Sequence, residues 1–193
     1  MRAVVGLGNV GPEYAASRHN VGFWVVERLL ARGRWRGETH PWGEVHRSSS
    51  GYLLRPFTYM NRSGEAVREL LARFPLTPQD LLVVYDEADL PVGALRLRAR
   101  GGPGTHRGME SVLAALGTDD VPRLRVGIGR PADGGDWVEH VLSPPPPAEA
   151  DALARAVDLA GELAWAFLTG GLAAALDRFS RERGTDRKST RLN

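Results

Sequence analysis

The fold is decided by residues 4–22, which read Val4-Val5-Gly6-Leu7-Gly8-Asn9-Val10-Gly11-Pro12-Glu13-Tyr14-Ala15-Ala16-Ser17-Arg18-His19-Asn20-Val21-Gly22. The segment begins as an apolar strand, breaks into a glycine-rich turn and ends with His19, just before an amphipathic helical pattern. In α/β proteins, ligands bind at the turn between a strand and the following helix. Because the imidazole of His19 titrates near neutral pH, this turn is a candidate for chemistry.

Strand and helix patterns alternate along the chain. Strands are expected at residues 2–7, 44–46, 51–55, 81–85, 94–99 and 124–128. Helices are expected at residues 21–32, capped by Asn20, and at residues 63–74, 106–116 and 147–169, followed by a short terminal helix. Residues 31–41 and 101–104 indicate turns or loops. This alternation predicts a single three-layer α/β domain over residues 1–185, with a twisted, mostly parallel mixed sheet flanked by helices.

The composition is typical of a globular protein, since 42% of the 193 residues are hydrophobic. No apolar run is long enough to span a membrane, and the amino terminus lacks the basic and apolar regions of a signal peptide. The chain contains no Cys, which excludes disulfides and thiolate metal sites. We therefore expect a cytoplasmic protein that does not act at a membrane. We further expect a monomer that uses no cofactor and no metal.

The last eight residues, Asp186-Arg187-Lys188-Ser189-Thr190-Arg191-Leu192-Asn193, differ from the rest of the chain. They contain its only Lys. We interpret residues 186–193 as a non-native addition. The formal net charge of +2 comes from this segment, because removing its three basic and one acidic side chains leaves a neutral body. A basic surface must therefore come from the placement of the arginines and not from their total number.

Asn9 and Asp86 both follow buried strands. The carboxyl ends of parallel strands meet at one edge of a sheet, so these side chains are expected to lie close together, with His19 beside them. A His next to a carboxylate is a common pair for general-base catalysis. The chain has neither a Cys nor a Gly-x-Ser-x-Gly elbow. The sequence therefore predicts a hydrolase in which water is the nucleophile and no covalent intermediate forms.

Asparagine is rare in this chain. Outside the last eight residues it occurs only as Asn9, Asn20 and Asn61. A carboxamide both donates and accepts hydrogen bonds without carrying charge. These residues therefore suit a site that holds a peptide backbone or an ester carbonyl.

Four segments together resemble the bacterial peptidyl-tRNA hydrolase family. They are residues 4–22, Phe57-Thr58-Tyr59-Met60-Asn61-Arg62-Ser63-Gly64, Asp86-Glu87-Ala88-Asp89-Leu90-Pro91-Val92-Gly93 and Arg123-Leu124-Arg125-Val126-Gly127-Ile128-Gly129-Arg130-Pro131. They occur in the family's order, and the resemblance extends from about Arg2 to Arg183. It implies hydrolysis of the ester that joins a peptide to the terminal ribose of tRNA, which recycles tRNA from stalled peptidyl-tRNA.

The resemblance also implies roles for individual residues. His19 is implied as the general base, Asp86 as the group that stabilises its charged form, and Asn9 as the residue that separates blocked from free aminoacyl ends. The implied substrate-binding residues are Tyr14, Tyr59, Met60, Asn61, Arg98 and Arg125, of which the last two match the family's basic pair for tRNA phosphate. Arginine suits this task because it combines charge with bidentate hydrogen bonds.

The chain departs from the family pattern at three points. Val10 replaces a usual Pro and Tyr59 a usual Phe. Thr105-His106-Arg107-Gly108 stands where the family has Gly-His-Asn-Gly. The missing amide is a contact to the tRNA end in the family. Arg107 could contact a phosphate instead, or crowd the cleft.

Other interpretations remain open. Gly6-Leu7-Gly8-Asn9-Val10-Gly11 fits a dinucleotide-binding pattern, although Pro12 and the late helix start disfavour it. Asp86, Glu87 and Asp89 fit a metal cluster or a solvated turn; we favour the turn for Glu87 and a local cap for Asp89, and only Asp86 stands at a strand end. His106 fits a helix cap or a contact at the rim of the site. A cluster of central arginines fits an RNA surface or an ordinary surface; its members are Arg96, Arg98, Arg100, Arg107, Arg123, Arg125 and Arg130. The alternative function is a catalytically weakened tRNA- or RNA-binding module of the same fold.

Overall fold

The computed structural model describes the backbone of residues 1–191 and the side chains of residues 1–184. Within this part of the chain a seven-stranded sheet has the order β2-β3-β4-β1-β5-β7-β6. The strands are β1 (Ala3–Gly6), β2 (Arg36–His40), β3 (Gly43–Ser48), β4 (Gly51–Pro56), β5 (Leu81–Glu87), β6 (Leu95–Arg98) and β7 (Arg123–Gly127).

The centre of the sheet is parallel and its edges are antiparallel. Strands β4, β1, β5 and β7 run in one direction, whereas β2 and β3 on one side and β6 on the other pair antiparallel. Every residue of β5 is buried, as expected for a strand covered on both faces. The parallel centre brings the carboxyl ends of β1, β5 and β7 to one edge, where the polar residues of the sequence motifs follow.

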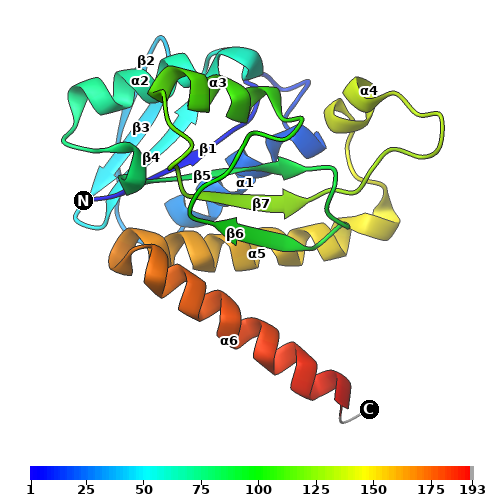
Figure 1. The fold of residues 1–193 in the computed structure, drawn as a ribbon. Coiled ribbons are helices and arrows are strands. Elements are labelled where there is room, and N and C mark those ends of the chain that lie inside the picture. Colours follow the sequence, from blue (N-terminus) through cyan, green and yellow to red (C-terminus); the bar gives the residue numbers. More distant parts are fainter. Residues whose placement is uncertain (192–193) are drawn as a thin grey trace.

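Helices cover both faces of this sheet (Figure 1). The helices are α1 (Val21–Leu30), α2 (Ser63–Arg73), α3 (Arg107–Leu116), α4 (Trp137–Leu142), α5 (Pro147–Gly170) and α6 (Leu172–Arg191). One apolar core lies between the sheet and α1 with α5, and a second lies between the sheet and α2 with α3. The three-layer prediction is therefore confirmed.

Glycine lets α1 pack directly on the central strands. A Cβ at Gly22 would lie 2.5 Å from the Leu7 nitrogen and from the Val84 carbonyl oxygen, so only glycine permits this approach. The contact places the short turn η1 (Arg18–Asn20), just before α1, against the end of β5. Because α1 begins at Val21, well beyond Gly11, the glycine turn does not open a helix as a dinucleotide site requires.

Three elements differ from the expectations. Strand β2 lies in a stretch expected to be irregular, because its polar side chains alternate at a half-exposed edge and its order comes from pairing with β3. Helix α4 was not expected; its start is capped by the Asp136 carboxylate, which accepts from two backbone N–H groups. The terminal helix was expected to be short, but α6 has 20 residues and extends away from the body (Figure 1).

The expectation that residues 186–193 are non-native concerns side chains outside the described residues and stays a prediction. Among the described residues, no helix is both long and apolar enough to cross a membrane.

Candidate active site

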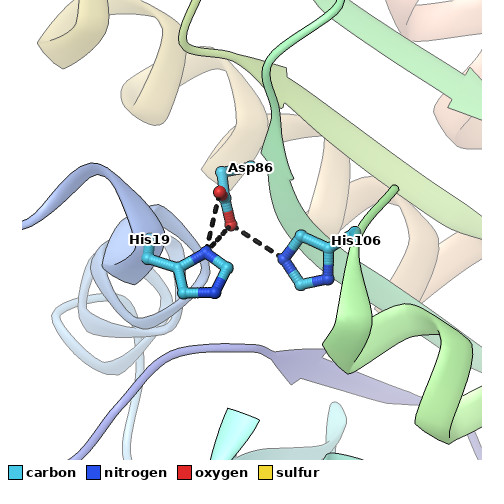
Figure 2. Close-up of side chains that lie close together, drawn as sticks. All are labelled: His19, Asp86 and His106. Atoms are coloured by element: carbon cyan, nitrogen blue, oxygen red, sulfur yellow. Dashed lines mark hydrogen bonds and ion pairs between the residues drawn. The ribbon is translucent and has the colours of Figure 1, made fainter. Parts of the chain in front are cut away.

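His19 and Asp86 lie in direct contact although they are distant in sequence. His19 belongs to η1 and Asp86 is the penultimate residue of β5. The His19 Nδ1 atom lies 2.8 Å from Asp86 Oδ2 and 3.0 Å from Oδ1 (Figure 2). Nδ1 must therefore carry the proton, which leaves the lone pair on Nε2. His19 also lines a cavity, so this nitrogen is available to a bound molecule.

The pair is electrostatically coupled. Asp86 is only 3% exposed, and burial alone would raise the pKa of its carboxyl. The charge of His19 and the hydrogen bonds from His19 and His106 outweigh burial and hold the pKa of Asp86 well below its usual range. Burial likewise acts to lower the pKa of His19, but the Asp86 charge and hydrogen bond raise it above its ordinary value. Asp86 is therefore an anion that stabilises the His19 imidazolium.

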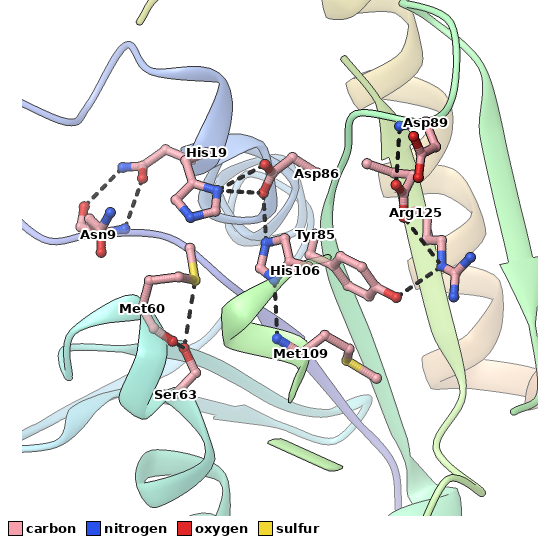
Figure 3. Close-up of polar contacts among 12 residues, drawn as sticks. Asn9, His19, Met60, Ser63, Tyr85, Asp86, Asp89, His106, Met109 and Arg125 are labelled. Atoms are coloured by element: carbon pink, nitrogen blue, oxygen red, sulfur yellow. Dashed lines mark hydrogen bonds and ion pairs between the residues drawn. The ribbon is translucent and has the colours of Figure 1, made fainter. Parts of the chain in front are cut away.

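His106 is a second imidazole on the same carboxylate. Its Nε2 atom lies 2.9 Å from Asp86 Oδ1, and its Nδ1 atom accepts the Met109 backbone N–H at the start of α3 (Figures 2 and 3). His106 is thus both a helix cap and a site contact, the two interpretations that its sequence position left open. The sequence did not predict the bond to Asp86, because His106 follows a glycine-rich loop and not the end of a parallel strand.

Asn9 is held by Asn20. The Asn20 Oδ1 atom accepts the Asn9 backbone N–H at 2.8 Å, and Asn20 Nδ2 donates to the Asn9 carbonyl at 2.9 Å. Asn20 lies at the cap position of α1, yet its side chain makes no capping hydrogen bond. The expectation of a capping role is therefore wrong, because the side chain is engaged in orienting Asn9 instead.

Two cavities meet at Asn9. The first, of about 630 Å³, is lined by Asn9, His19, Asp86, Met60, Asn61 and Arg107, and by the exposed apolar side chains of α4. The second, of about 670 Å³, is lined by Asn9, Tyr14, Tyr59, Trp42 and Phe57. All the residues expected around the substrate, except the arginine pair, therefore line one of these two adjoining cavities.

Met60 and Tyr59 differ in setting. The Met60 side chain is buried, and the Met60 backbone carbonyl accepts a hydrogen bond from the Ser63 hydroxyl (Figure 3). Tyr59 is 76% exposed and presents its ring to the second cavity. An open ring of this kind is free to stack on a nucleobase. Trp137 of α4 is 45% exposed and lines the first cavity.

Arg98 and Arg125 line neither described cavity. Arg98 is exposed on the edge strand β6, where its guanidinium donates to the neighbouring Leu97 carbonyl. Arg125, on β7, is largely engaged inside the protein: Nε donates to the Tyr85 hydroxyl at 2.9 Å (Figure 3), and Nη2 donates to the Gly102 carbonyl at 3.2 Å. Arg98 is therefore the freer cation of the two.

Arg123, which the sequence placed within a cluster of central arginines, is completely buried. Its guanidinium donates to the carbonyls of Gly101, Gly102, Val121 and Asp119. Burial lowers its pKa. Arg123 therefore anchors the glycine loop that leads to His106 and does not form part of a surface.

The ligand atoms of His19, Asp86 and His106 all lie within 4.8 Å of one another, a spacing that a metal ion could bridge. However, His106 Nδ1 accepts a backbone N–H, so the ring proton occupies Nε2, the atom that faces Asp86. A metal would have to displace this proton and break the cap. The geometry therefore favours a hydrogen-bonded network.

These features define a class of protein: a three-layer α/β protein with a carboxylate-supported imidazole at the carboxyl ends of parallel strands, a site suited to general-base chemistry. A sequence profile described as peptidyl-tRNA hydrolase matches residues 3–188. A peptidyl-tRNA hydrolase from Halalkalibacterium halodurans is 47% identical over 172 residues, which cover 86% of this chain and 93% of that protein. One from Symbiobacterium thermophilum is 44% identical over 187 residues, covering 93% and 98%.

A solved structure gives the same result. The crystal structure of peptidyl-tRNA hydrolase from Acinetobacter baumannii matches with a TM-score of 0.85 and 34% identity, covering 92% of this chain and 93% of that one. This chain therefore belongs to the peptidyl-tRNA hydrolase family, a family of enzymes, and the resemblance seen in the sequence is confirmed.

Proposed function

We propose that this protein hydrolyses the ester bond between peptide and tRNA in peptidyl-tRNA, with His19 as the general base. The observation that carries the proposal is the His19–Asp86 contact at 2.8 Å, which leaves His19 Nε2 free in a cavity. Membership of the family supports the substrate class, and both the cytoplasmic location and the monomeric state are part of the same proposal.

In the proposed reaction, His19 Nε2 takes a proton from water as the water oxygen attacks the ester carbonyl. Asp86 stabilises the resulting imidazolium. The tetrahedral intermediate then collapses, the bond between the carbonyl carbon and the ribose oxygen breaks, and His19 returns the proton to that oxygen. The products are a free peptide acid and tRNA with a free terminal ribose. No covalent enzyme intermediate and no cofactor take part.

Substrate binding is proposed to use both cavities around Asn9. The carboxamides of Asn9 and Asn61 are suited to hold the peptide backbone and the ester carbonyl. The aromatic cavity with Tyr14 and Tyr59 suits the terminal nucleotide, because every base presents a face for stacking. The acyl part then extends into the cavity of His19, which Met60 borders.

The tRNA phosphates are proposed to bind arginines outside the cavities, Arg98 foremost with Arg125 beside it, and Arg107 at the cavity rim. Arg107 is exposed and stands where the family has Asn. If Arg107 contacts a phosphate, the substitution Arg107→Asn should weaken tRNA binding. It should also flatten the dependence of tRNA affinity on salt by about one unit of slope. Tighter binding by Arg107→Asn would instead mean that the arginine crowds the cleft.

The proposal is tested with N-acetylated aminoacyl-tRNA and the same tRNA with a free amine. We expect release of tRNA from the blocked ester and little release from the free one. His19→Ala should slow turnover by about 10²–10⁴-fold while tRNA affinity persists. His46→Ala is the matched control, since His46 pairs with Glu44 on β3 and lines neither cavity. Binding of tRNA without turnover by the native protein would support the alternative of a binding module.

A further inference from the structure

Two imidazoles, those of His19 and His106, hydrogen-bond to Asp86, and the proposed reaction uses only His19. His19 approaches one side of the carboxylate and His106 the other (Figure 2). The His106 side chain is 5% exposed and its ring centroid lies 5.0 Å from that of His19. Because both ring nitrogens of His106 are hydrogen-bonded, the orientation of the ring is fixed. The proposed reaction does not explain why this buried polar ring lies next to His19 and Asp86.

The backbone of α3 determines which nitrogen of His106 carries the proton. Met109 N–H donates to Nδ1, so a second proton at Nδ1 would bring two donors face to face. The proton therefore occupies Nε2 and is donated to Asp86 Oδ1. His106 is thus a neutral donor, and the full negative charge of the carboxylate remains available to His19.

The ring of His106 is also fixed by its neighbours. The Tyr85 ring lies 4.8 Å away, centroid to centroid, and the Tyr85 hydroxyl accepts from Arg125 (Figure 3). A Cβ at Gly108 would lie only 2.9 Å from His106 Cε1. Arg125 in turn donates to Gly102 in the loop that leads to His106. The ring is therefore held between β5 and the first turn of α3.

We propose that His106 is a positioning residue for the hydrolysis proposed above: as a neutral donor to Asp86 Oδ1 it holds the carboxylate in place, with Oδ2 directed at His19 Nδ1. The proposal rests on the proposed function. His106 acts through Asp86 and need not touch the substrate.

A consequence follows for the acid–base behaviour of His19. The ionisable groups around the pair are Tyr85 and Glu87 on β5, Arg125 on β7, Arg107 on α3 and Arg18 on η1, which bonds away from the site. None of these is altered when His106 is replaced. Loss of the Nε2 donor would concentrate charge on Asp86 and admit water, and both changes favour the imidazolium and raise the pKa of His19.

The test is His106→Asn, which separates the two roles of the residue. The shorter amide can still cap α3 by accepting from Met109 N–H, but it cannot reach Asp86. We expect the acid limb of the kcat/KM profile to move to higher pH by about half a unit, and kcat at neutral pH to fall about tenfold. KM and Tm should change little. His46→Asn, at another His–carboxylate pair, should leave the profile unchanged.

Titration of the His19 ring by NMR in the absence of tRNA checks the same shift without any assay of activity. An acid limb or a His19 pKa that stays in place or moves to lower pH in His106→Asn overturns the proposal. If this variant does not fold, the ¹⁵N chemical shifts of the His106 ring in the native protein test the proposal. At neutral pH they must show a proton on Nε2 alone. Absence of hydrolysis by the native protein would instead refute the proposed function. The NMR titration would still test whether His106 affects the pKa of His19.

Discussion

The side chain of Asn20 hydrogen-bonds both backbone groups of Asn9, at 2.8 and 2.9 Å, and so ties the turn after β1 to the start of α1. Asn9 borders both cavities, so the side chain proposed to select the substrate is oriented by a residue that borders neither. Position in the sequence suggested a helix cap for Asn20. Its observed partners make it a determinant of the site instead.

Replacing Asn20 should therefore affect both stability and activity. Asn20→Ala removes two buried hydrogen bonds, and we expect the free energy of unfolding to fall by about 2 kcal/mol, measured by urea denaturation. The kcat/KM for blocked aminoacyl-tRNA should fall as well, because Asn9 is no longer held. Asn20→Asp retains the acceptor for Asn9 N–H, but it sets a buried carboxylate oxygen against the Asn9 carbonyl oxygen and should lose at least as much stability at neutral pH. An Asn20→Asp variant as stable as the native protein would contradict this account.

The pH dependence of hydrolysis follows from the His19–Asp86 pair. In the proposed reaction His19 accepts a proton only when it is neutral, so activity should be lost as the pH falls through its raised pKa. Asp86→Asn removes the charge that raises this pKa, so the acid limb should move to lower pH. Plateau turnover should fall by on the order of tenfold, a milder loss than in His19→Ala, because support for the imidazolium is lost but the base remains. An acid limb that moves to higher pH would show that Asp86 does not stabilise the imidazolium.

Arg123 should matter for stability and not for tRNA binding. Arg123→Met leaves several loop carbonyls without donors, and we expect a loss of about 3 kcal/mol in the free energy of unfolding. Arg123→Lys should rescue little, because one ammonium group cannot reproduce the fork of a guanidinium. Reduced tRNA affinity in a fully folded Arg123→Met would argue for a surface role that its burial does not suggest.

Arg98 and Arg125 should differ although both match the same family pair. Arg98→Ala should flatten the dependence of tRNA affinity on salt by about one unit of slope, because an exposed cation is removed. Arg125→Ala should change the slope less and lower stability more, since its guanidinium bonds Tyr85 and Gly102. Salt titrations and urea denaturation of the two variants distinguish these outcomes. Equal slopes and equal stabilities would contradict the assignment.

Several features of the fold were predictable from local patterns. The apolar run of β5 indicates a strand that is buried on both faces. The alternation of Leu and Arg in β6 indicates a strand with one exposed face. The motif around His19 and the position of Asp86 after a buried strand were enough to predict their contact, because parallel strands end at the same edge. Strand β2 and helix α4 could not be predicted in this way, since β2 owes its order to pairing with β3 and α4 is short.

By itself, the sequence determined the class of fold, the family and the contact between His19 and Asp86, because burial patterns and motif order can be read locally along the chain. Only the tertiary structure decided that Asn20 holds Asn9, that His106 shares Asp86 with His19, and that Arg123 is buried while Arg98 is exposed. Each of these depends on which atoms meet across the sheet. Hydrogen-bond direction and burial are properties of such contacts, and no local pattern of residues carries them.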